Sequence, residues 1–139
     1  ALPFERVGAP LGAPGSLGLC ADITAILKGL SVRKTGYCGL MLPVLEDAGL
    51  CSLADQGKLT LPVLLMMSSV CGVGLDTVPI PGAASELQLM RLYADTAGLA
   101  LKWNKPLSVR VFPVAGKAAG ERTAFDFQHL GNCRIFPLG

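Results

Sequence analysis

The chain has 139 residues, of which 51% are hydrophobic and 16% are charged, and its formal net charge is +2. This length is typical of one domain, and the charged fraction lies below the roughly 25% of an average soluble domain. The basic residues are scattered along the sequence, which excludes the clustered basic surface of a nucleic-acid-binding protein.

The longest apolar run, residues 59–75, reads LTLPVLLMMSSVCGVGL. It is at the short limit for a transmembrane helix and is interrupted by Pro62, Gly72 and Gly74, so we predict a buried helix and a turn rather than a membrane span. The first residues lack the apolar core of a signal peptide. Because the chain begins at Ala1 and is rich in apolar residues, we expect an upstream segment or a larger partner subunit to cover part of it.

The five cysteines form no C-x-x-C pair, and the chain contains a single histidine. A zinc site of cysteine and histidine ligands would therefore have too few ligands. We expect reduced thiols in a cytoplasmic protein, most of them buried in the core, and neither a metal nor another cofactor.

The first predicted helix spans residues 17–30, after a segment rich in glycine and proline, with Ser16 as its N-cap. Its apolar residues recur at intervals of three and four and should form one buried face, namely Leu19, Ile23, Ile26, Leu27 and Leu30. Residues 37–44, YCGLMLPV, are too short for a helix and predict a buried strand.

Two further helices are predicted after an acidic loop that begins at Glu46 and Asp47. One spans residues 50–56 and ends at Gly57. The other begins after the N-cap Thr60, tolerates Pro62 in its first turn, and ends at Gly72.

The second half of the chain predicts a strand, a helix and a second strand. The strands are residues 75–80 and 107–114, and the helix between them begins after the N-cap Ser85 and runs to about Trp103. Such a unit closes as a right-handed parallel crossover. The segment after it is a loop at residues 115–123, followed by a last strand near residues 133–136.

Four stretches of the sequence together resemble one known family: GYCGLMLPVLED, SSVCGVGLDTVPIPG, WNKPLSVRVFPVAGKAAGERTAFDF and NCRI. The chain is similar to the bacterial and archaeal domain of unknown function 711, also called uncharacterised protein family 0210. Members are several times longer, so the resemblance implies that this chain matches their carboxy-terminal portion. It also implies an α/β barrel similar to pyruvate formate-lyase and other glycyl-radical enzymes, but no established reaction.

Cys71 and Asp76 are the candidate catalytic residues. Cys71 follows a predicted helix and lies in a glycine-rich turn. One interpretation is a thiol nucleophile or a radical relay. The other, which is the commoner case for a free cysteine, is a small side chain buried in the core. Asp76 is the only charged residue among the fifteen residues 68–82. It is either a functional group, as a general base, metal ligand or ligand anchor, or a structural one that holds a turn through hydrogen bonds to the backbone.

The candidate ligand-binding residues follow or lie on the second strand of the crossover. They are Arg110, Lys117, Gly120, Arg122 and Thr123. The carboxyl ends of parallel strands bind ligands, so this basic loop could take an anionic group, although a solvated basic loop is the commoner case. His129 is the only imidazole available for catalysis, and a packing role is far more common.

Two hypotheses about function remain at this stage. The first is an enzyme acting on a small, anionic substrate, with a pocket at the strand ends around Asp76 and the loop at residues 115–123. The second is a non-catalytic structural or regulatory subunit that completes the barrel of a partner chain. In either case we expect an oligomer, no nucleic acid and no membrane.

Overall fold

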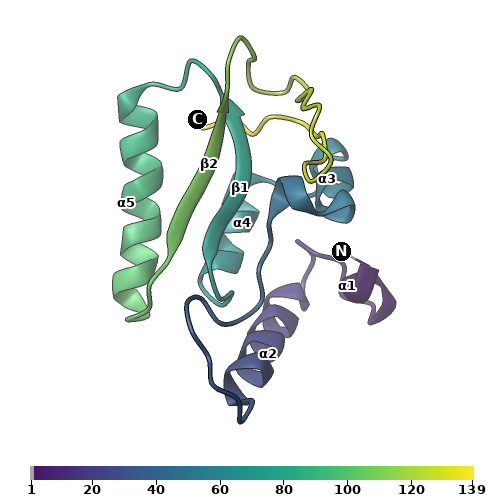
Figure 1. Ribbon diagram of the computed structural model, residues 1–139, viewed down its shortest axis with the longest axis vertical. Coiled ribbons are helices and arrows are strands. Elements are labelled where there is room, and N and C mark those ends of the chain that lie inside the picture. The colour runs from purple at the N-terminus through teal and green to yellow at the C-terminus, as the bar shows by residue number, and fades with distance from the viewer. Residues whose placement is uncertain (1) are drawn as a thin grey trace.

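The computed structural model describes residues 2–139 and contains six helices and two strands. The amino-terminal half is helical, and the strands lie in the second half (Figure 1). In chain order the elements are α1 (Leu2–Arg6), α2 (Ser16–Gly29), the 3₁₀ helix η1 (Val44–Glu46), α3 (Ala48–Asp55), α4 (Leu61–Ser68), β1 (Gly74–Pro81), α5 (Glu86–Lys102) and β2 (Ser108–Val114).

The strand–helix–strand unit predicted from the sequence is confirmed. Strands β1 and β2 pair in parallel, and α5 connects them. Helix α5 begins with a capping box, in which the Ser85 hydroxyl accepts from the backbone of Gln88 and the Gln88 side chain accepts from the backbone of Ser85. Two of the amide groups that a helix start leaves without partners are thereby satisfied.

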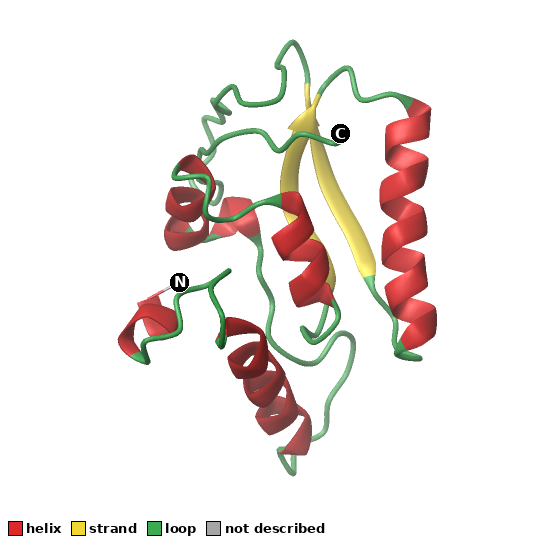
Figure 2. Ribbon diagram, turned by 180° about the vertical axis from the view of Figure 1, so that it is seen from behind, coloured by secondary structure: helices red, strands yellow, loops and turns green. Residues whose placement is uncertain are grey.

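Strand β1 occupies the centre of the molecule. One edge pairs with β2, and the other edge contacts Pro43 through an isolated bridge and receives a hydrogen bond from the backbone of Phe136. Helix α4 lies over one face of β1, as the view from behind shows (Figure 2), and it also contacts α5. Leu75, Val78 and Ile80 are consequently fully buried.

Strand β2 has a different environment, because its outer edge pairs with no other strand of residues 2–139. Its side chains are half-buried or exposed. No helix of residues 2–139 lies over the face of the two strands that is turned toward the viewer in Figure 1. Parallel sheets are normally covered on both faces, whereas residues 2–139 place helices over one face of this sheet.

Helix α2 forms where the sequence predicts it, and its predicted buried face is right only in part: Leu19 and Ile23 are half-buried and pack against the core. Ile26 is 65% exposed and Leu30 is 48% exposed, whereas the buried residues are the small Ser16, Cys20 and Thr24. The reason is a close approach of the chain, since a Cβ on Gly39 would lie 2.8 Å from the Thr24 methyl group. Only small side chains on α2 permit this packing.

The ends of the helices follow the sequence in part. Asp47 caps α3 by accepting from Leu50, and Thr60 caps α4 as predicted, with Pro62 in the first turn. The predicted cap at Ser16 is wrong, because Gly15 precedes α2 with a φ of 94° and makes no side-chain cap. Helix α4 also ends at Ser68 rather than near Gly72.

Two predicted strands do not form. Residues 37–44 make one bridge only, between Pro43 and Asp76, because Pro43 has no N–H to donate to a ladder and Val44 already begins η1. Near residues 133–136 there is likewise one bridge, between Arg122 and Arg134. The carboxy-terminal segment is held instead by scattered backbone bonds, such as that from Ile135 to the carbonyl of Glu121.

The fold is therefore a mixed α/β arrangement with a small parallel sheet. Residues 2–139 do not form the closed barrel that the family resemblance implies. No helix in the described part of the chain is both long enough and apolar enough to cross a bilayer.

Candidate functional site

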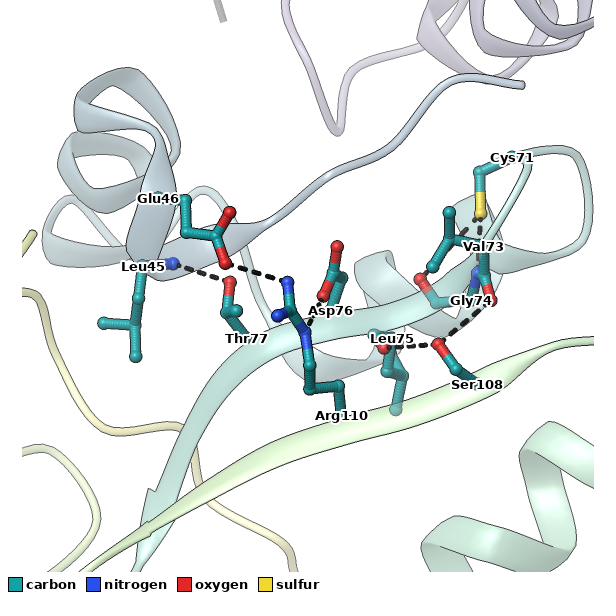
Figure 3. A network of polar contacts seen from close by, with 10 residues as sticks. All are labelled: Leu45, Glu46, Cys71, Val73, Gly74, Leu75, Asp76, Thr77, Ser108 and Arg110. Carbon is teal, nitrogen blue, oxygen red and sulfur yellow. Dashed lines mark hydrogen bonds and ion pairs between the residues drawn. The ribbon is translucent and has the colours of Figure 1, made fainter. Parts of the chain in front are cut away.

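A cluster of three charged side chains lies where β1, β2 and η1 meet. The Arg110 guanidinium lies across β1 between two carboxylates (Figure 3). Its Nε donates to Asp76 Oδ1 at 2.5 Å, and its Nη2 donates to Glu46 Oε1 at 2.8 Å. Asp76 is buried, whereas the side chains of Arg110 and Glu46 are 51% and 39% exposed. We call these three residues the Arg110 cluster.

A β-bulge brings Asp76 opposite Arg110. Leu75 pairs with Val109 and Val78 pairs with Val111, so Asp76 and Thr77 together face one residue of β2. Such a bulge redirects side chains and is common beside active sites.

Thr77, the second residue of the bulge, has an unusual backbone conformation. Its φ is 46°, which a β-branched residue rarely adopts. The side chain is fully buried, and its Oγ1 accepts from the backbone of Leu45 at 3.2 Å. Backbone strain of this kind costs about 1–3 kcal/mol and persists at functional sites, where the surrounding structure enforces it.

The two carboxylates fix the orientation of the guanidinium. The hydrogen bond to Asp76 and, to a smaller extent, the charges of Asp76 and Glu46 raise the pKa of Arg110, against the opposing effect of desolvation. The Nη1 group of Arg110 has no acceptor within residues 2–139. It can therefore donate to a carboxylate or phosphate oxygen from outside, with its geometry already set.

Cys71 lies at the entrance to β1, away from the Arg110 cluster (Figure 3). It is 1% exposed, and its sulfur accepts from the backbone N–H of Gly74 at 3.2 Å. The Nζ of Lys105 donates to its carbonyl oxygen at 2.8 Å. Cys71 is therefore a small side chain buried in the core, which is the second of the two interpretations of the sequence.

The loop at residues 115–123 lies at the carboxyl ends of both strands. From the strand register, Asp76 is five residues before the end of β1, or about 16 Å along the strand. The sequence predicted one pocket around Asp76 and this loop, but the structure places Asp76 and the loop apart. A shallow cavity of about 320 Å³ beside this loop is lined by Pro81, Ala83, Gly116, Lys117, Ala118, Ala119 and Glu121.

Most of the polar groups of this loop already have partners in the chain. Lys117 pairs with Glu121 at 3.3 Å, and Arg122 pairs with Asp55 at 2.8 Å. The buried Thr123 donates to the side chain of Asn132. Gly120 has a φ of 85°, and its N–H donates to Ile135. These contacts fix the loop against the carboxy-terminal segment.

His129 is exposed, and its ring lies 5.3 Å from that of Phe127 in an edge-to-face arrangement. Within residues 2–139 no three side chains of histidine, cysteine, aspartate or glutamate gather in a way that could hold a metal ion.

Sequence reasoning missed the role of Glu46, which it assigned to a loop. Glu46 ends η1 and reaches Arg110 across 64 positions of the chain, so no local pattern could reveal the contact. The one feature of the sequence that pointed to the Arg110 cluster was the isolation of Asp76 in an apolar stretch.

The fold and the cluster define a class: part of an α/β protein, with a parallel strand–helix–strand unit and a buried carboxylate paired to a half-exposed arginine. Residues 4–126 match the family model described as "Uncharacterised ACR (DUF711)". The chain is 39% identical over 140 residues to a UPF0210 protein of Oleidesulfovibrio alaskensis, covering 97% of this chain and 30% of that protein.

Archaeal relatives are similar to the same extent. A UPF0210 protein of Methanosarcina acetivorans is 36% identical over 141 residues, covering 99% of this chain and 30% of that protein. A UPF0210 protein of Pyrobaculum aerophilum is 38% identical over 133 residues, covering 92% of this chain and 29% of that protein. The chain therefore belongs to the DUF711 (UPF0210) family, whose function is uncharacterised, and spans about 30% of the length of these relatives. No solved structure matches it.

Proposed function

We propose that this chain carries part of the substrate site of an enzyme that acts on a small molecule with a carboxylate or phosphate group. The observation that supports the proposal is the Arg110 cluster, in which a buried carboxylate on a strained bulge orients a half-exposed guanidinium. Buried charges with specific partners and strained backbone both concentrate at functional sites.

Within this site Arg110 would bind the anionic group of the substrate through its free Nη1. Asp76 and Glu46 would hold the guanidinium in place, so Asp76 acts as a positioning residue. The three side chains carry a formal charge of −1 together, and a substrate with a hydrogen-bond donor beside its anionic group would satisfy both signs of charge. The free cysteines favour the cytoplasm, where thiols stay reduced.

A binding experiment tests this proposal. Saturation-transfer NMR would screen the chain against a panel of small carboxylates and phosphates. For a compound that binds, Arg110→Lys should abolish binding, because lysine keeps the charge but lacks the planar fork of donors. Arg91→Lys, on the exposed side of α5, is the matched control. If no compound binds, or if Arg110→Lys binds as well as the natural chain, the proposal fails.

A second candidate function is a non-catalytic segment that completes the core of a longer protein or of a larger partner subunit. The outer face of α5 favours it. Residues at intervals of three and four along this helix are apolar and exposed, opposite the face that packs on the strands: Leu87, Met90, Ala94, Ala97 and Leu101. Leu101 is 82% exposed, which is unusual for a face left to solvent.

This second candidate includes the complete architecture that the family resemblance implies. We propose that the complete protein is an α/β barrel similar to pyruvate formate-lyase, of which residues 2–139 form the carboxy-terminal portion. The unpaired edge of β2 and the uncovered face of the sheet support this arrangement.

The second candidate predicts that the chain alone self-associates through its uncovered faces. Size-exclusion chromatography with light scattering would measure this. The double variant Met90→Glu/Leu101→Glu should shift the chain toward the monomer, whereas Arg91→Glu on the polar side of α5 should not. A monodisperse monomer of the natural chain would contradict this candidate and leave the first one untouched.

A further inference from the structure

A second cavity lies at the opposite end of the strands from the loop at residues 115–123, where the chain enters β1 and β2. Its volume is about 180 Å³. It is lined by Lys28, Gly36, Tyr37, Cys38, Gly72, Lys105 and Pro106. Pockets for drug-sized molecules measure about 300–1,000 Å³, so this cavity fits a small ion or one functional group.

Two lysines and no acidic residue line this cavity. The Nζ of Lys105 donates to the carbonyl oxygens of Ser69 at 3.0 Å and Cys71 at 2.8 Å, which uses two of its three N–H donors. These bonds fix the position of the charge. The Nζ of Lys28 has no hydrogen-bond or ion-pair partner within residues 2–139.

Lys28 acts electrostatically on Lys105. Desolvation lowers the pKa of Lys105, and the positive charge of Lys28 lowers it further, while Cys71 has an opposing effect. An anion between the two ammonium groups would relieve this repulsion.

The loop beside the lysines offers further donors. The backbone N–H groups of Gly36, Tyr37 and Cys38 donate no hydrogen bond within residues 2–139. Gly36 has a φ of 67°, and a Cβ at this position would meet nothing within 4 Å. Successive free N–H groups in a turn form the concave surface that commonly binds anions.

We propose that this cavity is a binding site for a phosphate-type dianion, held between Lys28 and Lys105 and by the N–H groups of residues 36–38. The dianion is either free phosphate or the phosphate group of a small metabolite. The site is separate from the Arg110 cluster and does not depend on the function proposed for it.

Cys38 provides a direct reporter for this site, because it is half-buried while the other four cysteines are buried. The rate of its alkylation by neutral iodoacetamide would be measured by peptide mass spectrometry with and without phosphate, at constant ionic strength. Bound phosphate should slow the reaction by the factor 1 + [phosphate]/Kd, about elevenfold at ten times Kd. Lys28→Gln should remove this protection.

Lys58→Gln is the matched control, since it changes the net charge equally at an exposed lysine outside the cavity. Each variant is compared with itself, with and without phosphate, so a changed basal rate does not affect the result. Stronger protection by ethyl phosphate than by phosphate would identify a monoester, and equal protection would identify the free ion.

Absence of protection in the natural chain, with chloride as the reference, would overturn the proposal. Equal protection in Lys28→Gln and in the natural chain would also overturn it. Because Lys28 is exposed, the variant should keep the natural circular dichroism spectrum and unfolding midpoint, and these two measurements exclude misfolding as the cause of lost protection.

Discussion

The ion pair between Arg110 and Asp76 should contribute to stability in an asymmetric way. Arg110→Gln leaves the buried carboxylate of Asp76 without its partner, and an uncompensated buried charge costs about 3 kcal/mol. Asp76→Asn leaves a half-exposed guanidinium that water can solvate and that Glu46 still holds, so we expect a loss of about 1 kcal/mol.

The double variant Arg110→Gln/Asp76→Asn removes both charges and should cost about 2 kcal/mol, less than the sum of about 4 kcal/mol for the single changes. Urea unfolding followed by circular dichroism measures these differences. A loss of about 3 kcal/mol in the free energy of unfolding lowers the urea midpoint by about 1.5 M, when this free energy falls by about 2 kcal/mol per M of urea.

Glu46→Gln serves as the control at the exposed end of the cluster and should cost less than about 1 kcal/mol. Two outcomes would refute the reasoning. Asp76→Asn could prove as destabilising as Arg110→Gln, which would mean that burial does not set the cost. Alternatively, the double variant could lose the sum of the single changes, which would mean that the two charges are not coupled.

Three further predictions concern the packing and the thiols, and urea unfolding measures each of them. Gly72→Ala should destabilise the protein by at least about 2 kcal/mol, since the added Cβ would lie 2.6 Å from the Cα of Gly39. The control Gly98→Ala, with open space around it in α5, should stabilise the protein by about 0.5–1 kcal/mol. Similar effects of the two changes would contradict the close crossing of the backbone at Gly39 and Gly72. Ser85→Ala should cost about 1 kcal/mol by removing the capping box, and an unchanged midpoint would show that the cap is dispensable. Burial raises the pKa of Cys133 to about 12 from 9.0, so the unfolded state loses this proton first, and stability should decline as the pH rises from about 9 to about 12. Cys133→Ala should decline less steeply over that range, and equal slopes would refute the assignment.

Local signals determined much of the second half of the chain. The alternation in β2, the Ser85 cap and the prolines around β1 are short-range features, and they sufficed to predict β1, α5, β2 and their parallel pairing. The family assignment also came from ordered sequence motifs and was confirmed. Each of these inferences depends on residues close together in the chain.

The candidate site was predicted only in part. The sequence indicated Asp76 through its isolation and Arg110 through its place on a strand, but it could not pair them. Their contact depends on the bulge at Thr77, which nothing in the local pattern marks, because a β-branched residue ordinarily avoids a positive φ.

The sequence by itself determined helices α2 to α5, strands β1 and β2, the caps at Thr60 and Ser85, and the family to which the chain belongs. The tertiary structure alone decided which face of α2 is buried, because the close crossing of Gly39 and Gly72 requires small side chains there. It also decided that residues 37–44 do not form a strand and that Glu46 joins Arg110. Long-range packing sets these outcomes, since it rewards contacts between residues that no local periodicity connects.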